Sequence, residues 1–406
     1  MSIRKGILYV FIANAINLIF SLITSLFLPK FLSIDTYSYI KLFQLYVTYV
    51  GILHLGYADG MYLRLGGKDK NKLDKEEIIT EFNTFKLFQI IVVSILLIFS
   101  LIIKSKMLLL CSLAILPINI GNYIRNLYQA TGEFKKYSRY TNISTFLVFI
   151  VNMFLLFIMK NDNAILYIIG YLISYVIYWI FIEFEVLKEF GFNTFTNIKY
   201  LVSDVKDGFF LMIGNFCNVI FTGIDRLFVQ HLLGSIEFAY YSFAVSIENL
   251  LSVFITPIST VMYNYFCNNN DSENISKIKN YLLILTSYLM IAAFIIKYIV
   301  YHFINKYSQS IDVLFILFIA TYLSIIVRCI HVNLYKAYKK QNKYFVTMLV
   351  IIILSVIANI IGYSINKSNY SIAIATLVIN AIWFIIGEIE FRDSKMHFSS
   401  YLYMIL

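Results

Sequence analysis

Long apolar runs separated by short polar connectors follow one another along the chain up to residue 391. A helix needs about 20 mostly apolar residues to cross the hydrocarbon of a bilayer. By that rule the pattern predicts an all-α integral membrane protein with twelve transmembrane helices. The predicted spans are residues 6–31, 38–62, 82–103, 107–128, 141–159, 164–183, 207–232, 238–266, 280–301, 311–334, 345–365 and 371–391.

A weak internal repeat divides the chain into two halves. A shift of 201 residues lays 14–33 over 215–234, and a shift of 207 lays 126–137 over 333–344. The asparagines paired by these shifts are Asn14 with Asn215, Asn17 with Asn218, and Asn152 with Asn359. Because six spans is an even number, both halves would enter the membrane in the same orientation. We therefore predict two six-helix lobes, residues 1–200 and 201–406, around a central cavity.

The composition agrees with lipid as the main solvent. Hydrophobic residues make up 60% of the chain and charged residues 14%, and the mean hydropathy is +0.76. A soluble globular chain is about 25% charged. Lys and Arg outnumber Asp and Glu by 33 to 23, but they cluster between the apolar runs. This placement indicates membrane topology and not a nucleic-acid partner.

The basic residues between spans also predict the orientation, because cytoplasmic loops carry an excess of Lys and Arg. With the N-terminus inside, 21 basic residues fall on the cytoplasmic side and 6 on the outer side. Both termini are therefore expected in the cytoplasm. The first apolar run follows Arg4 and Lys5, and no small-residue cleavage site comes after it. We interpret it as a retained span and not as a signal peptide.

Polar side chains form stripes along several spans, because residues three and four apart share one face of a helix. The first and seventh spans carry equivalent stripes, which are Asn14, Asn17, Ser21, Thr24 and Ser25, and Asn215, Asn218, Thr222, Asp225 and Arg226. Such amides and hydroxyls either bridge packed helices or line a polar lumen. Both interpretations stay open for Asn14 and Asn17. Asp225 and Arg226 point about 100° apart as helix neighbours, so each is expected to have its own partner.

Charged side chains within spans favour the lumen interpretation. A charge at depth costs at least about 2.5 kcal/mol, so it normally faces water or a partner. The deep charges are Arg226, Glu248 and Arg328; Lys41, Asp59 and Arg125 lie near span ends, where snorkelling is the alternative; and His54 and His331 are interpreted as structural. The chain has no P-loop motif, no H-E-x-x-H motif and no Cys/His cluster. No metal or other cofactor is therefore expected.

Four stretches occur in a recognisable order and spacing. They are "LPKFLSIDTYSYIKLFQ" (28–44), "LHLGYADGMYLR" (53–64), "YQATGEFKKY" (128–137) and "DRLFVQHLLGSIEFAYYSFA" (225–244). Together they resemble the polysaccharide-transporter (O-antigen flippase) branch of the multidrug/oligosaccharidyl-lipid/polysaccharide exporter superfamily, over essentially the whole chain. Two departures are interpreted as divergence: Ser33 and Ile34 replace a frequent glycine turn, and 335–344 lacks a counterpart of Gly132.

The resemblance implies a flippase, and not an enzyme, in the bacterial cytoplasmic membrane. Such a protein moves undecaprenyl-pyrophosphate-linked oligosaccharide repeat units to the outer leaflet for O-antigen or capsule assembly. It does so by alternating access between its lobes. A sugar head group needs this help because each unpaired hydroxyl costs several kcal/mol in hydrocarbon. Its partners would be the lipid-linked oligosaccharide, membrane lipid and other polysaccharide-assembly proteins.

Site residues follow from the stripes and this implied function together. The residues expected to bind the sugar and the pyrophosphate are Asn14, Asn17, Arg125, Asn215, Asn218, Arg226 and Arg328. A coupling ion, H⁺ or Na⁺, is expected at Asp225, with Glu248 and Asp59 as further candidates; the alternative for Asp225 is a counter-charge to a basic neighbour. Two other functions stay open. One is a cation-coupled multidrug exporter on the same fold, whose lumen should be more acidic. The other is a membrane polysaccharide polymerase, which usually needs a larger outer loop.

Overall fold

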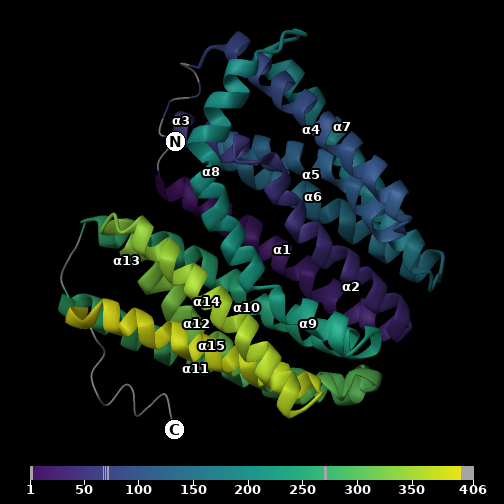
Figure 1. The fold of residues 1–406 in the computed structure, drawn as a ribbon, viewed down its shortest axis with the longest axis vertical. Helices are drawn as coiled ribbons and strands as arrows, with labels where there is room; N and C mark the ends of the chain where they lie inside the picture. The colour runs from purple at the N-terminus through teal and green to yellow at the C-terminus, as the bar shows by residue number, and fades with distance from the viewer. Residues whose placement is uncertain (1–2, 67, 69, 71–72, 269–271, 395–406) are drawn as a thin grey trace. The chain divides into compact units, whose positions relative to one another are not determined.

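The computed structural model describes residues 3–66, 68, 70, 73–268 and 272–394, with side chains left out for 3–14 and for scattered later positions, most of them between 252 and 268. All regular secondary structure in these ranges is helical. The predicted all-α fold class is therefore confirmed. Figure 1 shows the order of the helices along the chain.

The helices have the following bounds. The first half of the chain contains α1 (Ile3–Phe31), α2 (Ile34–Tyr49), η1 (Val50–His54), α3 (Tyr57–Leu65), α4 (Lys75–Ile103), α5 (Lys106–Ala130), α6 (Phe134–Met153), η3 (Phe154–Ile158) and α7 (Ala164–Phe190). The second half contains α8 (Ile198–Phe221), α9 (Ile224–Leu232), α10 (Ser235–Asn268), α11 (Ser272–Phe303), η4 (Asn305–Tyr307), α12 (Ser310–Ile326), η5 (Val327–His331), α13 (Val332–Ala337), α14 (Gln341–Ile365), α15 (Asn369–Glu390) and η6 (Arg392–Ser394).

Each predicted span coincides with one of these helices or with a broken run of them. Among the described residues, eight helices are long and apolar enough to cross a membrane, and α8 with α9 forms a ninth span bent by 47°. The three remaining predicted spans fall on α1, on α10, and on the run from α2 to α3. The last of these is interrupted at Leu55 and Gly56, which both have positive φ.

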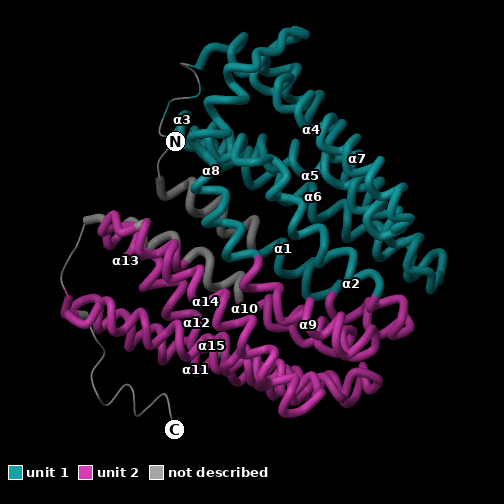
Figure 2. The backbone as a smooth tube through the Cα atoms, in the orientation of Figure 1, with its two compact units in different colours: residues 1–24, 39–219 teal, residues 25–38, 220–406 magenta. Residues whose placement is uncertain are grey.

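The chain divides into two compact units, one of residues 1–24 and 39–219 and the other of residues 25–38 and 220–406 (Figure 2). We call them unit 1 and unit 2. The division cuts through α1, α2 and α8, so most of α8 packs with the helices of the first half. The lobe boundary near residue 200 stays a prediction.

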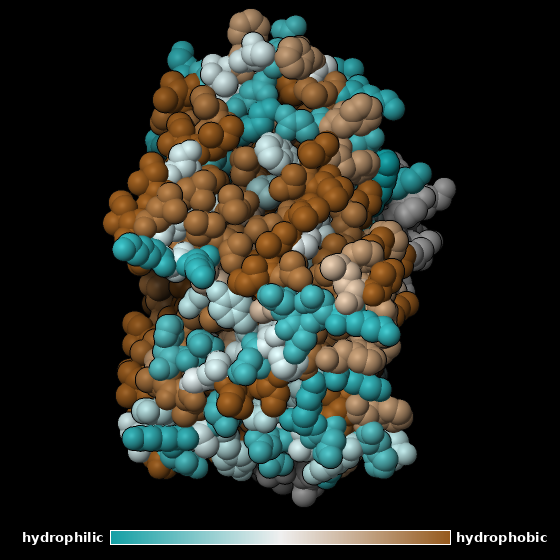
Figure 3. Space-filling view, turned by 90° about the vertical axis from the view of Figure 1, so that its right-hand side faces the viewer, coloured by the Kyte–Doolittle hydropathy of each residue, from teal (hydrophilic) through white to brown (hydrophobic). Residues whose placement is uncertain are grey.

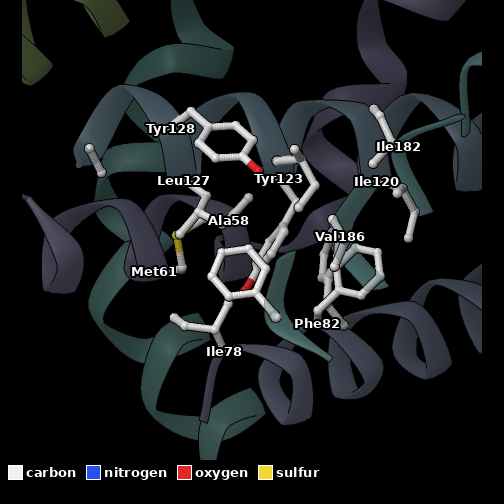
Figure 4. Packing of buried hydrophobic residues seen from close by; sticks show 14 of the residues in the cluster. Ala58, Met61, Ile78, Phe82, Ile120, Tyr123, Leu127, Tyr128, Ile182 and Val186 are labelled. Atoms are coloured by element: carbon white, nitrogen blue, oxygen red, sulfur yellow. The ribbon is translucent and has the colours of Figure 1, made fainter. Parts of the chain in front are cut away.

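Unit 1 has an aromatic core formed by α3, α4, α5, α6 and α7 (Figure 4). The ring of Tyr123 stacks on Phe85 with centroids 4.9 Å apart, and Phe85 stacks on Tyr57 at 5.0 Å. All three side chains are fully buried. Because lipid is as apolar as these side chains, close packing and not water exclusion is the main source of stability here.

The helices α3 and α8 approach each other through glycines within unit 1. A Cβ atom at Gly60 would lie 2.0 Å from the carbonyl oxygen of Asp204, and one at Gly208 would lie 2.0 Å from that of Gly56. Small residues at such positions let two backbones pack closely. The contact fixes the first half of α8 on α3.

Unit 2 packs α10, α11 and α15 against α12, and α14 against α15. The buried ring of Tyr307 is a centre of this packing. Its centroid lies 5.4 Å from that of Tyr37, 5.7 Å from Tyr240 and 4.9 Å from Phe243. Elsewhere in the unit, Phe221 meets Trp383 edge to face at 5.0 Å.

The turns after α5 and α13 share one backbone geometry although their sequences differ. Gly132 has a φ of 73° and Lys339 a φ of 55°, and a shift of 207 residues superposes these two positions. Lys339 therefore adopts a left-handed conformation that is costly for a residue with a side chain. The turn at Lys339 therefore keeps the shape of the turn at Gly132 although it lacks the glycine.

Large apolar side chains cover broad areas of the surface, as Figure 3 shows for one face. On α4, for example, Ile95 is 60% exposed and Ile102 72% exposed. Exposed apolar area of this extent marks a surface that contacts lipid or a partner. Together with the span lengths, it indicates a multi-pass membrane protein.

The glycine contact between α3 and α8 generates a stability prediction. We expect Gly208→Ala to destabilise the protein by at least about 1–3 kcal/mol, because the added methyl group overlaps the backbone of α3. The matched control is Gly214→Ala on the same helix, where a Cβ atom would have nothing within 4 Å. The control should be neutral or slightly more stable, since alanine favours helix. Thermal unfolding in detergent measures both, and equal melting temperatures would contradict the contact.

Candidate functional site

Asp225 lies in the first turn of α9, directly after the break that separates α9 from α8. Its carboxylate accepts hydrogen bonds from the backbone N–H of Arg226 at 2.7 Å and from the hydroxyl of Tyr241 at 2.8 Å. The Tyr241 hydroxyl also lies 3.4 Å from the Thr376 hydroxyl, so the contact joins α9, α10 and α15. Asp225 is 7% exposed. Burial at such a break is stabilised because a helix N-terminus favours negative charge.

Arg226 points to a different partner from its neighbour, as the sequence predicted. Its guanidinium donates to the backbone carbonyl of Thr222 at 3.2 Å, across the break between the two helices. Its Nε atom is buried and has no hydrogen-bond acceptor in the described part of the chain. Arg226 therefore keeps donor capacity that the fold leaves unused.

Glu248 on α10 and Arg328 in the π-helical turn η5 belong to the same charged group of unit 2. The Glu248 carboxylate accepts a hydrogen bond from the Thr321 hydroxyl at 2.5 Å. Arg328, and more weakly Asp225 and Arg226, lie near enough to act on this carboxylate electrostatically. The Arg328 Nε atom is also buried without an acceptor among the described residues.

These four side chains carry two negative and two positive charges, but they do not form close ion pairs. Within the ranges described, neither Arg226 nor Arg328 has a carboxylate oxygen within 4.0 Å. Both arginine residues are half-buried. A half-buried guanidinium that lacks a carboxylate partner can bind a phosphate group through two parallel hydrogen bonds. Unit 2 therefore contains two cationic groups suited to an anionic ligand.

Asp59 belongs to a polar group of unit 1. It is 7% exposed on α3, and its carboxylate lies 3.4 Å from the amide of Asn215 and 3.6 Å from Nε2 of His54. His54 accepts the backbone N–H of Gly56 at Nδ1, so Nε2 carries the proton that faces Asp59. Asp59 is thus enclosed within the unit, and snorkelling does not describe its side chain.

The remaining predicted residues are more scattered. The side chain of Asn14 lies outside the described residues, while Asn17 is half-buried with no partner for its amide oxygen among those described. Arg125 hydrogen-bonds to Asn122 on its own helix. Asn218 is exposed on α8. The substrate residues predicted from sequence are thus distributed over both units, with Arg226 and Arg328 in unit 2.

The sequence pattern did not predict two charged clusters that the structure contains. In unit 2, Glu388 accepts from Lys279 at 2.5 Å and from Nε2 of His331 at 2.8 Å, which joins α15, α11 and η5. The Lys279 side chain is fully buried although the sequence placed it in a loop. Gly387 packs directly against the His331 ring, because a Cβ atom there would lie 2.0 Å from Nδ1. A charged residue at the edge of an apolar run was the available signal.

In unit 1, Arg64 on α3 binds Asp204 on α8 through two hydrogen bonds of 3.1 and 3.2 Å. It also contacts Glu81 on α4 at 2.7 Å. The sequence pattern left all three residues just outside the predicted spans. Their distances along the chain gave no reason to bring them together.

Comparison with known proteins identifies the relatives of this chain. Residues 3–270 match a protein family whose description is "Polysaccharide biosynthesis protein". No curated protein matches the sequence.

Solved membrane transporters share the fold. The lipid II flippase MurJ, in an inward closed conformation, superposes with a TM-score of 0.75 at 15% identity, covering 97% of this chain and 89% of that one. An inward-facing multidrug resistance MATE family transporter of the MOP superfamily gives 0.67 at 12% identity, covering 93% and 94%. A MOP superfamily transporter from Pyrococcus furiosus gives 0.58 at 12% identity, covering 96% and 95%. The chain therefore shares its fold with these three solved transporters.

The cluster around Glu388 generates a stability prediction. We expect Glu388→Gln to cost about 3–5 kcal/mol, because Lys279 would stay buried without a counter-charge. The double variant Lys279→Met with Glu388→Gln should recover most of this loss. The control is Glu390→Gln on the same helix, whose lysine partners Lys340 and Lys343 are exposed, so only a small loss of stability is expected, because ion pairs with exposed lysines contribute little. Unfolding midpoints in detergent test the series, and additive single effects would contradict it.

Proposed function

The chain belongs to the polysaccharide biosynthesis protein family, and on this premise we propose that it is a flippase for lipid-linked oligosaccharide. Its substrate is an undecaprenyl-pyrophosphate-linked repeat unit that serves surface polysaccharide assembly, O-antigen or capsule. The family match over residues 3–270 is the observation that carries this proposal. The fold shared with a lipid II flippase supports it.

The proposed mechanism assigns the pyrophosphate to Arg226 and Arg328. Both keep a buried donor without an acceptor among the described residues, and a phosphate oxygen would supply one. The sugar hydroxyls would form hydrogen bonds with four asparagines, namely Asn14, Asn17, Asn215 and Asn218. Their amides would replace the hydrogen bonds that the sugar makes to water outside the membrane.

Transport would proceed by alternating access of two six-helix lobes about a central cavity, while the lipid tail stays in the membrane. The bend between α8 and α9 gives one candidate hinge, because residues between two helix ends can absorb a change in φ and ψ. The protein would act in the bacterial cytoplasmic membrane, with both termini in the cytoplasm and other assembly proteins as partners. Arg125, which already bonds to Asn122, would have a secondary role.

The second candidate function is a cation-coupled multidrug exporter. Two observations favour it: the fold shared with MATE family transporters and the two carboxylates of Asp225 and Glu248 in unit 2. A lipophilic cation would need such acidic groups. The two arginines in the same group repel a cation, so the anionic substrate is the better fit.

The coupling ion, H⁺ or Na⁺, would bind at Asp225, with Glu248 and Asp59 as further candidates. Moving one charge through about 100 mV supplies about 2.3 kcal/mol. The buried carboxylate of Asp225 is already surrounded by the Tyr241 hydroxyl and a backbone N–H. A proton would remove its charge, and Na⁺ would bind to the carboxylate lone pairs that these two donors leave unused.

Substitution of Arg226 and Arg328 tests whether they bind the pyrophosphate of the substrate. We expect Arg226→Ala or Arg328→Ala to lower flipping of lipid-linked oligosaccharide in proteoliposomes about tenfold or more, since a hydrogen bond to a charged group contributes about 1.5–3 kcal/mol. Lysine at either position should restore only part of the rate, because it loses the two-pronged geometry. The control is Arg139→Ala, whose side chain is 56% exposed and pairs with Glu185. Full activity in both alanine variants would remove the cationic site.

Asp225 generates the test of coupling. If it carries the ion, Asp225→Asn should fold and bind substrate, but its flipping should no longer respond to an imposed ion gradient. The control is Tyr241→Phe, which removes the hydrogen bond and keeps the charge. If Asp225 only balances a basic neighbour, Asp225→Asn should instead lower the protein level. A normal gradient response in Asp225→Asn would exclude it and leave Glu248 or Asp59.

A further inference from the structure

Arg64, Glu81 and Asp204 form an ionic cluster inside unit 1 that the proposed transport mechanism does not use. Glu81 and Asp204 have carboxylates that are at most 1% exposed, and both contact the same guanidinium. Arg64 comes from α3, Glu81 from α4 and Asp204 from α8. The cluster therefore joins three helices.

The two carboxylates are not equivalent. Asp204 accepts two aligned hydrogen bonds, from Nε at 3.1 Å and from a terminal nitrogen at 3.2 Å. Glu81 lies 2.7 Å from Arg64, but neither of its oxygens accepts a hydrogen bond within the described ranges. The guanidinium geometry thus matches Asp204 and leaves the fully buried Glu81 carboxylate poorly satisfied.

The charges of this cluster do not balance. One guanidinium faces two buried carboxylates, so an ionised cluster has one uncompensated negative charge. Burying such a charge without a counter-charge is strongly unfavourable. Among the described residues, the other titratable groups with the strongest electrostatic effect on the cluster are acids and phenols, namely Tyr57, Glu77, Tyr123, Tyr200 and Asp207. None of them compensates for the excess, and a bound proton would.

We propose that the cluster is a proton-binding site in which Glu81 is protonated while Asp204 stays ionised and paired with Arg64. The proton comes from water and occupies one of the Glu81 oxygens that lack a hydrogen bond. With it bound, the buried cluster is electrically neutral. When the proton leaves, two carboxylates compete for one guanidinium.

The position of Asp204 gives this proton a structural consequence. The backbone of Asp204 is the part of α8 that Gly60 of α3 touches most closely. A protonated Glu81 leaves Arg64 to Asp204 and holds α8 on α3. An ionised Glu81 weakens that contact, so acid favours the held state and alkali the released one. The helix α8 continues to the break before Asp225, the proposed coupling residue. An effect of this proton on transport through α8 therefore rests on the proposed function.

Infrared spectroscopy of the purified protein in lipid nanodiscs tests the bound proton without any transport assay. During a pH titration the wild type should show a carboxylic-acid C=O band that disappears as Glu81 ionises. Glu81→Gln should lose the signal of one carboxyl group. Asp204→Asn should lose the same signal at neutral pH, because Arg64 then pairs with an ionised Glu81.

The matched control is Glu77→Gln, one turn away on α4, whose side chain is 42% exposed and lies 3.6 Å from Arg64. It should keep the band and its titration. An unchanged band in Glu81→Gln would overturn the proposal. Since glutamine resembles protonated glutamic acid in shape, Glu81→Gln should fold even where Asp204→Asn does not, and it decides the question alone.

A distance measurement tests the effect on α8. Leu63 and Val202 are 53% and 63% exposed and accept spin labels on α3 and α8. The label-to-label distance should widen with rising pH in the wild type and stay short in Glu81→Gln. A constant distance in the wild type would overturn the link to α8. Failure of flipping in every protein, wild type included, would overturn the proposed function while the infrared result stood.

Discussion

The cost of polar groups in hydrocarbon is the constraint on which this structure depends. An α-helix avoids this cost for its backbone, because each N–H and C=O forms a hydrogen bond within the same segment. A charged side chain has no such partner in its own backbone, so its partner must come from another helix. Arg64 holds Asp204 and Glu81, and Lys279 holds Glu388. Each cluster therefore joins three helices within its unit, and helix packing becomes inseparable from charge pairing.

The buried charges fall into two kinds with different physical roles. The cluster of Lys279, His331 and Glu388 is closely paired and almost free of solvent contact. Arg226 and Arg328 are half-buried, and no carboxylate lies within 4.0 Å of them in the described ranges. A paired cluster stabilises the fold, whereas a guanidinium with unused donors is suited to a ligand. This difference is why the proposed substrate site lies at the two arginines.

The helix α8 takes part in the ionic cluster of unit 1 and ends at the break before Asp225. Its first half packs on α3 through glycines and through the Arg64–Asp204 pair. Its other end stops at the break that precedes Asp225 and Arg226. The helix α8 thus runs from the proposed proton site to the break that precedes the proposed coupling and substrate residues. Such an element can transmit a local change in charge, because a packed helix moves as a unit.

The sequence by itself determined the all-α fold and where the apolar helices lie, because apolar length and periodicity are local properties of the chain. It also indicated that Asp225 and Arg226 have separate partners, since neighbours on a helix point apart. Only the tertiary structure decided which charges meet. Glu81 and Asp204 lie at the edges of apolar runs, where a sequence pattern reads them as solvated, and their common partner Arg64 belongs to a third helix. Long-range packing selects such pairs, and a single sequence contains no local signal for it.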